Sequence, residues 1–411
     1  MNPDVLVIGA GAAGTAAARA LHDAGVITLL IDARDRIGGR ARTIHHGEAA
    51  LDLGCGWLHS ARRNGWTDVA RAAGFTVATD TARWGEQWRD LGFPPDDQRA
   101  FARARDAWEA RARAAASGPD QPLSAFVAPD DRWRPMLDAI SGYANGANLS
   151  DVSLHDWLAY EDAATEDNWA LRRGYGTLVA QHVGDVPVRT GVAATHVDHS
   201  GGDLRVETTA GTIAARAVIV AVPTPVLADG RLRFTPALPD KHAAAAALPL
   251  GIADKAFLAV DAPDWPHDAH LIGNTCRTCT ASHRLSPFGW PVIESFFGGD
   301  CAEQLEQGDA AAFAIDEIVA LLGSDWRRRL TPITATRWRH EPWIEGSYSH
   351  ARVGHADQRE VLARPVEQRI FFAGEACSPH DFSTAHGARD TGLAAAEDAR
   401  RALARLTATR A

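Results

Sequence analysis

The segment DVLVIGAGAAGTAAARALHDAGVITLLIDARD, residues 4–35, contains the clearest indication of fold class in this chain. An apolar run at residues 5–8 is followed by a glycine-rich turn, an alanine-rich helical stretch and a second apolar run at residues 27–31. This order of elements predicts a βαβ unit whose two strands lie in one parallel sheet.

Gly9, Gly11 and Gly14 form a G-x-G-x-x-G pattern in the turn. Such glycines allow a tight turn and a close approach of the backbone to a pyrophosphate, whose charge the helix N-terminus then meets. Asp32 ends the second apolar run, where a carboxylate accepts hydrogen bonds from both ribose hydroxyls. The pattern predicts a dinucleotide site for an unphosphorylated ribose, and it fits NAD and FAD equally.

Residues 32–40, DARDRIGGR, add paired glycines and three arginines directly after the ribose acid. A second phosphate-facing loop of this kind suits the long, extended FAD. Here the sequence resembles the flavin-dependent amine oxidase family, which covers monoamine oxidases, polyamine oxidases and the related histone lysine demethylases. The resemblance implies that Asp32, Arg34, Gly39 and Arg40 bind the cofactor.

Residues 53–59, LGCGWLH, are similar to the family loop that passes the flavin ring. The resemblance implies cofactor contacts for Gly56 and Trp57 and a substrate-facing position for His59. A single histidine fits a structural or surface role equally well. Val192 matches the family residue whose backbone meets the adenine.

Residues 249–255, PLGIADK, resemble the family stretch whose lysine reaches the flavin N5 through a water. Lys255 would then be catalytic, because an ammonium there stabilises negative charge on the reduced ring. Only Lys241 and Lys255 are lysines among 42 Lys plus Arg, so a lysine marks a place where a compact ammonium is needed. A structural salt bridge is the alternative role for Lys255.

Residues 338–348, WRHEPWIEGSY, resemble a family block that packs on the flavin and lines the substrate site. The resemblance implies that Trp338 contacts the cofactor and that Trp343 and Tyr348 contact the substrate. Aromatic faces attract a cationic amine and, once desolvated, favour its neutral form. Ser347 stands where monoamine oxidases have the cysteine that anchors the flavin, so we expect non-covalent FAD.

Residues 371–375, FFAGE, and 382–388, FSTAHGA, resemble the polyamine oxidase form of the C-terminal motif more closely than the monoamine oxidase form. The resemblance places Gly374 and Glu375 beneath the diphosphate. A helix that starts near Thr384 would aim its positive end at the flavin. Thr384 occupies the position of a second aromatic wall residue, so it contacts substrate or serves only as an N-cap.

The resemblance implies an α/β fold in which a Rossmann-like FAD-binding domain is interleaved with an α+β substrate domain. Block by block, the FAD-binding parts are expected at residues 1–74, 182–247 and 346–411. The substrate parts are expected at residues 75–181, which are mostly helical, and at residues 248–345. The first, middle and last blocks of strands would then form one sheet.

The composition excludes several classes of protein. A chain of 411 residues with 46% hydrophobic residues is a packed protein of more than one subdomain. A net charge of −10 argues against a nucleic-acid partner, and no apolar run reaches the roughly 20 residues that span a bilayer. The first strand begins too early to leave room for a signal peptide, so we expect a cytoplasmic protein without a membrane partner. The sequence leaves the oligomeric state open.

Five cysteines are an odd and sparse set, which argues against a disulfide framework. Cys276 and Cys279 form a lone CxxC, which fits half a zinc site or a redox pair. With no second CxxC in the chain, we expect two free thiols in a loop and no bound metal.

The resemblance implies oxidation of an amine to an imine, hydrolysis to a carbonyl compound plus amine, and reduction of O2 to hydrogen peroxide. Two alternatives stay open, a flavin-dependent desaturase or isomerase acting on C–C bonds and a non-catalytic FAD-binding redox sensor. Carboxylates around the substrate entrance would favour diamines and polyamines, but the sequence places none there.

Overall fold

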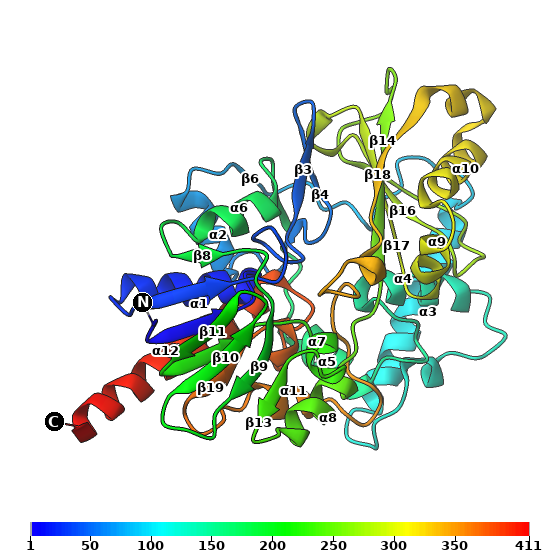
Figure 1. Cartoon of the computed structure of the whole chain (residues 1–411). Helices are drawn as coiled ribbons and strands as arrows, with labels where there is room; N and C mark the ends of the chain where they lie inside the picture. Colours follow the sequence, from blue (N-terminus) through cyan, green and yellow to red (C-terminus); the bar gives the residue numbers. More distant parts are fainter. Residues whose placement is uncertain (1, 411) are drawn as a thin grey trace.

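The computed structural model describes residues 2–410 and has a parallel central sheet of five strands (Figure 1). In spatial order the strands are β19 (Ile370–Phe372), β12 (Ala217–Val220), β1 (Val5–Ile8), β2 (Thr28–Ile31) and β8 (Val188–Arg189). The sheet therefore takes strands from the first, middle and last parts of the chain. The predicted α/β class with a Rossmann-like sheet is confirmed.

Helices α1 (Ala12–Asp23) and α12 (Ala385–Arg410) pack side by side on one face of this sheet. Alternate residues of β1 divide between its two faces: Val5 and Val7 contact the helices, while Leu6 and Ile8 enter the core on the other side. A Cβ on Gly392 of α12 would lie 2.2 Å from the Ala13 carbonyl oxygen, so only glycine allows this approach of the two helices.

The turn between β1 and α1 requires its glycines. Gly9 has φ of +104°, and a Cβ on Gly14 would lie 1.7 Å from the Gly9 carbonyl oxygen. No side chain occupies that space, so the helix starts directly against the end of the strand.

A smaller sheet and three short helices cover the other face of the central sheet. The sheet contains β11 (Gly211–Ala215), β10 (Leu204–Thr208), β9 (Ala194–Asp198) and β13 (Arg233–Thr235). The helices are α7 (Thr224–Ala228), α8 (Pro239–Ala247) and α11 (Gln358–Ala363).

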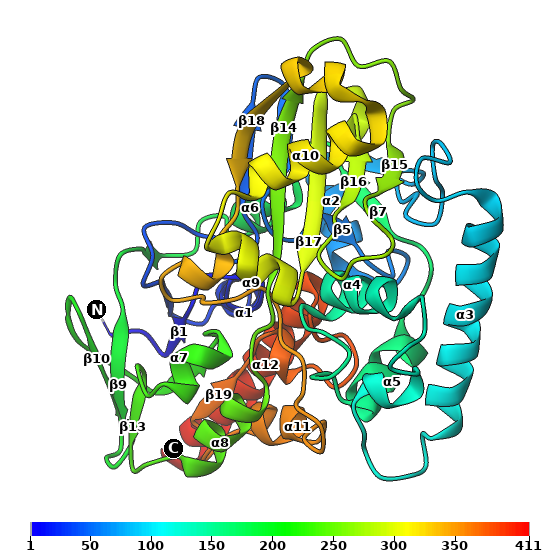
Figure 2. The same ribbon diagram turned by 90° about the vertical axis from the view of Figure 1, so that its right-hand side faces the viewer.

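A separate five-stranded antiparallel sheet forms the upper part of the molecule in Figure 2. Its strands are β15 (Ala269–Ile272), β16 (Ser282–Leu285), β17 (Val292–Gly298), β14 (Ala253–Val260) and β18 (Leu330–Ala335). Helices α9 (Asp300–Glu306) and α10 (Ala310–Leu322) pack on one face, where Leu258 and Ile293 share a buried apolar cluster with Ala314 and Ile318. The other face of the sheet is therefore free to meet the nucleotide-binding part of the chain.

The predicted helical block holds α3 (Pro95–Ala114), α4 (Arg134–Asn145), α5 (Leu154–Ala163) and α6 (Tyr175–His182), after α2 (Gly65–Ala72). The short strands around it are β3 (Thr43–His46), β4 (Ala49–Asp52), β5 (Trp57–Leu58), β6 (Val77–Ala78) and β7 (Trp169–Leu171). The arrangement of the sheets agrees with an interleaved chain, and the five block boundaries stay predictions.

The expectation of a free thiol at Cys279 is wrong, because Cys279 forms a disulfide with Cys301. Cys301 lies in the first turn of α9, and the fold brings its Cα to 4.6 Å from that of Cys279 across 22 residues of sequence. Cys276, the other half of the CxxC, is exposed and free. Within residues 2–410, no cluster of three or more His, Cys, Asp or Glu side chains is arranged to hold a metal ion.

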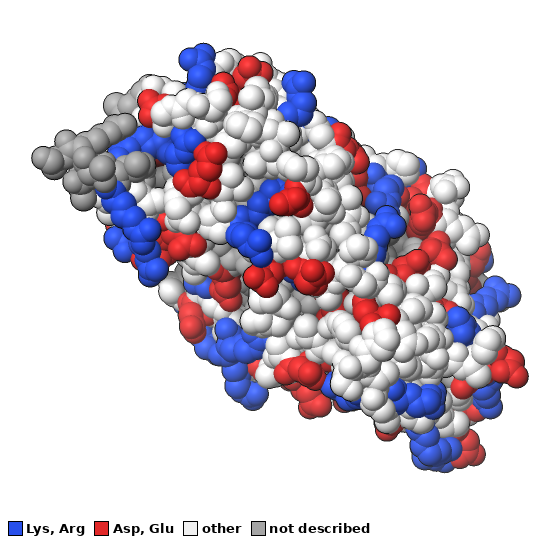
Figure 3. All heavy atoms as spheres, turned by 90° about the horizontal axis from the view of Figure 1, so that it is seen from below, with Lys and Arg blue, Asp and Glu red and all other residues white. Residues whose placement is uncertain are grey.

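None of the helices among the described residues has the length and apolar character needed to cross a bilayer. Basic and acidic side chains are intermixed over the face of the molecule seen in Figure 3.

Candidate functional site

The two glycine-rich loops predicted to hold a dinucleotide lie against each other. Gly38 donates its N–H to the Ala10 carbonyl at 2.8 Å, and a Cβ on Gly39 would lie 3.1 Å from the Gly11 Cα. The first residues of α1 have no side-chain cap, because Gly11 is the N-cap. Free amides at a helix N-terminus can donate hydrogen bonds to a phosphate.

Asp32 fixes the end of β2 next to this turn. Its carboxylate accepts hydrogen bonds from the Ala10 amide at 2.7 Å and from the Arg34 amide at 2.8 Å. The backbone of Val192 donates to the Asp32 carbonyl at 2.8 Å, so the residue predicted to meet the adenine does lie beside the predicted ribose acid. The Arg34 guanidinium pairs with Glu341 at 2.5 Å and has a buried Nη1 with no partner.

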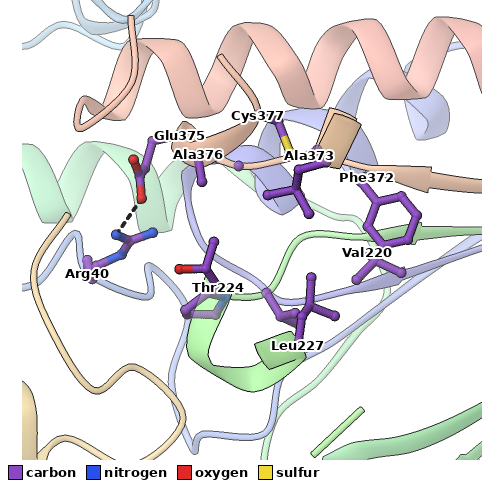
Figure 4. A pocket seen from close by; sticks show the side chains of 13 residues that line it. Arg40, Val220, Thr224, Leu227, Phe372, Ala373, Glu375, Ala376 and Cys377 are labelled. Carbon is purple, nitrogen blue, oxygen red and sulfur yellow. Dashed lines mark hydrogen bonds and ion pairs between the residues drawn. The ribbon is translucent and has the colours of Figure 1, made fainter. Parts of the chain in front are cut away.

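A small cavity of about 20 Å³ lies at the carboxyl ends of β12 and β19 (Figure 4). Its lining residues come from distant parts of the chain and include Arg40, Thr224, Leu227, Gly374 and Glu375. Crevices at the carboxyl ends of parallel strands are the usual ligand sites of such sheets.

Glu375 is held from three directions. Its carboxylate accepts hydrogen bonds from Arg40 at 2.9 Å, from the Ser349 hydroxyl at 2.7 Å and from the Ser383 amide at 2.8 Å. Burial raises the pKa of this carboxyl, but Arg40 and the hydrogen bonds offset that effect, so the net pKa lies below its ordinary value. Glu375 is therefore an anion that positions Arg40 and the loop before α12.

Lys255 lies on β14 against the loop predicted to pass the flavin. Its Nζ donates to the Asp52 carbonyl at 2.8 Å and forms an ion pair with Glu294 at 2.7 Å. A Cβ on Gly56 would lie 3.4 Å from the same Nζ, so the loop backbone approaches the ammonium closely. The structure thus brings the predicted lysine and the predicted flavin loop together. It also contains a salt bridge of Lys255, which was the alternative role for this residue.

Glu294 was missed by the sequence analysis. It lies on β17 opposite Phe257, and only the register between β14 and β17 brings it to Lys255. Burial raises the pKa of the Glu294 carboxyl, but Lys255 and Arg284 offset this and lower the net pKa below its ordinary value. Glu294 is therefore ionised and fixes Lys255.

Trp338 and Tyr348 are each fixed by a hydrogen bond to a backbone carbonyl. Trp338 is buried and donates its indole N–H to the Leu53 carbonyl at 3.3 Å. Tyr348 is half-buried and donates its hydroxyl to the Tyr143 carbonyl of α4. The Ser347 hydroxyl accepts from the Ala253 amide and donates to the Ala253 carbonyl, both at 2.8 Å, which joins this segment to β14.

His59 and Thr384 have structural partners. The His59 Nδ1 lies 2.7 Å from the Asn168 amide oxygen, and burial lowers the pKa of His59 to about 4. The Thr384 hydroxyl accepts from the Gly387 amide at 3.0 Å and donates to the Asp381 carbonyl at 2.6 Å. Thr384 therefore caps α12, which agrees with the N-cap alternative. Its contact with the substrate stays a prediction.

Among the described residues, Trp343 has no recorded contact with the other residues predicted to bind the substrate. It packs against the core that contains Val192 and Leu232, and the Arg231 Cζ lies 5.4 Å from its ring centroid. These neighbours place Trp343 with the nucleotide-binding part of the chain.

A buried carboxyl lies next to Lys255 in sequence. Asp254 accepts hydrogen bonds from the Thr336 hydroxyl and, at 3.2 Å, from the Trp338 amide. Burial and the neighbouring Glu306 raise the pKa of Asp254 to about 8, which the Thr336 hydrogen bond opposes. Asp254 therefore keeps its proton to a higher pH than an exposed aspartate does, and it joins β14 to the segment that carries Trp338.

We expect this carboxyl to make the protein less stable as the pH rises from about 4 to about 8. In that window the unfolded chain has lost the proton that the folded chain keeps, so the free energy of unfolding falls with pH. Asp254→Asn removes the group and should flatten this slope. Urea unfolding of both proteins at pH 5 and pH 8 measures this change in the free energy of unfolding. The same change in the natural protein and in the variant would contradict the assignment.

The geometry agrees with what comparison with known proteins shows. The model of the family described as flavin containing amine oxidoreductase matches residues 106–400, and a model of NAD(P)-binding Rossmann-like domains matches residues 7–72. The chain belongs to the flavin-containing amine oxidoreductase family. The resemblance to flavin-dependent amine oxidases is thereby confirmed.

Relatives within this amine oxidoreductase family match over nearly the whole chain. The identity is 27% to polyamine oxidase 4 of Oryza sativa subsp. japonica, over 97% of this chain and 89% of the relative. It is 29% to lysine-specific histone demethylase 1 homolog 2 of the same plant, over 95% of this chain and 56% of the relative. A solved structure of putrescine oxidase bound to putrescine has a TM-score of 0.76 at 18% identity, covering 98% of this chain and 99% of that one, and so shares the fold.

The residues present fit the flavin dinucleotide that the family implies. The uncapped N-terminus of α1 and the unpartnered buried nitrogens of Arg34 and Arg36 are unused donors for an anionic group. Asp32, Arg40 and Glu375 would hold the adenosine and diphosphate. The larger set of predicted cofactor residues is Gly9, Gly11, Gly14, Asp32, Arg34, Gly39, Arg40, Gly56, Trp57, Val192, Trp338, Gly374 and Glu375.

Proposed function

We propose that this protein oxidises an amine to an imine with non-covalent FAD, and that O2 is the final electron acceptor. The position of the Lys255 ammonium against the Asp52 carbonyl and the Gly56 loop, which the resemblance places at the flavin ring, supports the proposal most strongly. Bound FAD would supply the acceptor for the two electrons that leave the C–N bond. In total, amine, O2 and water give a carbonyl compound, ammonia or a smaller amine, and hydrogen peroxide.

The protein residues bind, orient and stabilise charge. Two protons of the Lys255 ammonium are used by Glu294 and the Asp52 carbonyl, so the cation is held in place. A fixed cation away from bulk water stabilises negative charge that develops beside it. The Tyr348 ring is oriented by its bond to the Tyr143 carbonyl and offers an aromatic face to a cationic amine.

Amine-dependent formation of peroxide tests the proposal. Purified, flavin-loaded protein is mixed with monoamines, diamines and polyamines, and peroxide and oxygen uptake are recorded. A yellow protein that forms no peroxide with any of these amines would favour the desaturase or sensor alternatives over amine oxidation.

We expect acid precipitation to release the flavin completely into the supernatant. The Ser347 hydroxyl has no sulfur for a thioether link, and both of its hydrogen bonds go to Ala253. Absorbance and mass spectrometry of the supernatant identify the released compound as FAD. Flavin that stays with the precipitated peptide would contradict the non-covalent proposal.

A further inference from the structure

The carboxylates nearest to Lys255 already have partners within the protein, which limits how many ammonium groups a substrate can place there. Residues opposite each other in antiparallel strands share a face, so Lys255, Phe257, Arg284, Glu294 and Phe296 lie on one side of the sheet, named here the Lys255 face. The opposite side packs on α9 and α10.

Glu294, the carboxylate of the Lys255 face, already has two cationic partners and is not available to bind a substrate ammonium. It lies 2.7 Å from the Lys255 Nζ and 3.8 Å from Arg284, whose Nε also donates to Asp268 at 2.9 Å. A substrate ammonium that took Glu294 would leave the buried Lys255 ammonium without its counter-ion, which is costly.

Asp52, the next carboxylate, is saturated as well. It accepts hydrogen bonds from the Thr43 hydroxyl at 2.6 Å, from the Tyr175 amide at 2.9 Å and from the Gly176 amide at 3.2 Å. Its carboxyl group is therefore used to connect β4 with α6.

An additional cation lies next to this face. The Arg284 guanidinium is 5.0 Å from the Phe288 ring, and the exposed Arg172 donates to the Phe288 carbonyl at 3.0 Å. Arg172 has no carboxylate partner among the ion pairs of the described residues. Excess positive charge there repels a polycation.

Aromatic side chains complete the surroundings. Trp84, which is 42% exposed, packs edge to face on Trp57 with 4.8 Å between ring centroids, and Arg284 lies 4.7 Å from the Trp57 ring. The His59 ring is 6.2 Å from Trp84. A large exposed indole beside two predicted site residues offers contact area to an apolar or aromatic group.

We infer that the substrate is a monoamine whose remainder is aromatic or apolar and packs on Trp57 and Trp84, and that diamines and polyamines are disfavoured. This inference rests on the proposed function. Its chemistry is that of the amine oxidation above, in which the C–H and N–H bonds of the amine lose two electrons and two protons to form the imine, and O2 gains them as hydrogen peroxide.

The decisive comparison uses amines of equal length on the flavin-loaded enzyme. Putrescine and n-pentylamine differ by the replacement of a terminal ammonium with a methyl group, and 4-phenylbutylamine adds a ring. We expect kcat/KM to be at least about tenfold higher for each monoamine than for putrescine, because Glu294 and Asp52, the carboxylates nearest to Lys255, already have partners. A preference for putrescine or spermidine would overturn the inference while supporting amine oxidation.

Variants then test the two features separately. Trp84→Ala should raise KM for 4-phenylbutylamine about three- to tenfold with little change in kcat, and Trp84→Phe should recover most of it. Ile27→Ala, the matched change at another exposed large apolar residue, should have no effect. Arg172→Glu should raise kcat/KM for putrescine relative to n-pentylamine. An unchanged KM in Trp84→Ala would overturn the role of Trp84.

Binding measured by quenching of tryptophan fluorescence separates the two proposals. If no amine is oxidised but 4-phenylbutylamine still binds more tightly than putrescine and loses affinity in Trp84→Ala, amine oxidation fails and the ligand class stands. If putrescine binds more tightly, the ligand class fails whatever the turnover.

Discussion

Lys255→Met is expected to lower kcat/KM for amine oxidation by about 10²–10³-fold while the FAD content stays unchanged. The methionine has nearly the same length but no charge, so the negative charge that develops in the reaction loses its fixed cation. The Glu294 carboxylate loses its counter-ion as well. Stopped-flow measurement of flavin reduction under anaerobic conditions, with flavin content read from absorbance, measures the effect.

Lys241→Met provides the matched control, because Lys241 is the other lysine of the chain and is also buried. Its ammonium donates to the carbonyls of Val361, Leu362 and Arg364 at the end of α11, away from the Lys255 contacts. We expect this variant to lose stability and to keep its rate of flavin reduction per folded molecule. If Lys255→Met also stays within threefold of the natural rate, the catalytic assignment is wrong.

Arg359→Met is expected to lower the free energy of unfolding by about 3–5 kcal/mol, the usual cost of leaving one partner of a buried ion pair. Arg359 and Asp156 are 1% and 2% exposed, and two hydrogen bonds of 2.6 and 2.8 Å connect them. Arg359 also donates to the Ser349 hydroxyl at 2.9 Å, which in turn donates to Glu375. Denaturant unfolding of the purified protein measures the loss.

Two further variants decide how the loss arises. The double variant Arg359→Met with Asp156→Leu removes both charges and should recover much of the stability, because no charge is left buried alone. Arg364→Met removes a mostly exposed partner of Glu360 and should change stability by less than about 1 kcal/mol. A double variant as unstable as Arg359→Met would show that packing, and not charge, explains the loss.

The scarcity of lysine was a useful but incomplete signal. It singled out Lys255, and the structure shows that each lysine uses a compact ammonium to reach two or three acceptors. At Lys241 those acceptors are carbonyls at a helix end, which is a structural role. The scarcity of lysine therefore indicates positions where a compact ammonium is needed. The groups around each lysine determine whether its role is structural or catalytic.

Sequence patterns were enough to predict the β1–α1–β2 unit, the two glycine loops and the family, because these depend on residues close together in the chain. Gly9, Gly14 and Asp32 meet through one turn, so their spacing is enough to predict the contact. The partners of Lys255 and Cys279 could be found only in the folded chain. Glu294 reaches Lys255 through strand register, and Cys301 reaches Cys279 through the packing of α9 on the sheet. Strand register and helix packing arise from the burial of many side chains at once, which no local pattern of residues encodes.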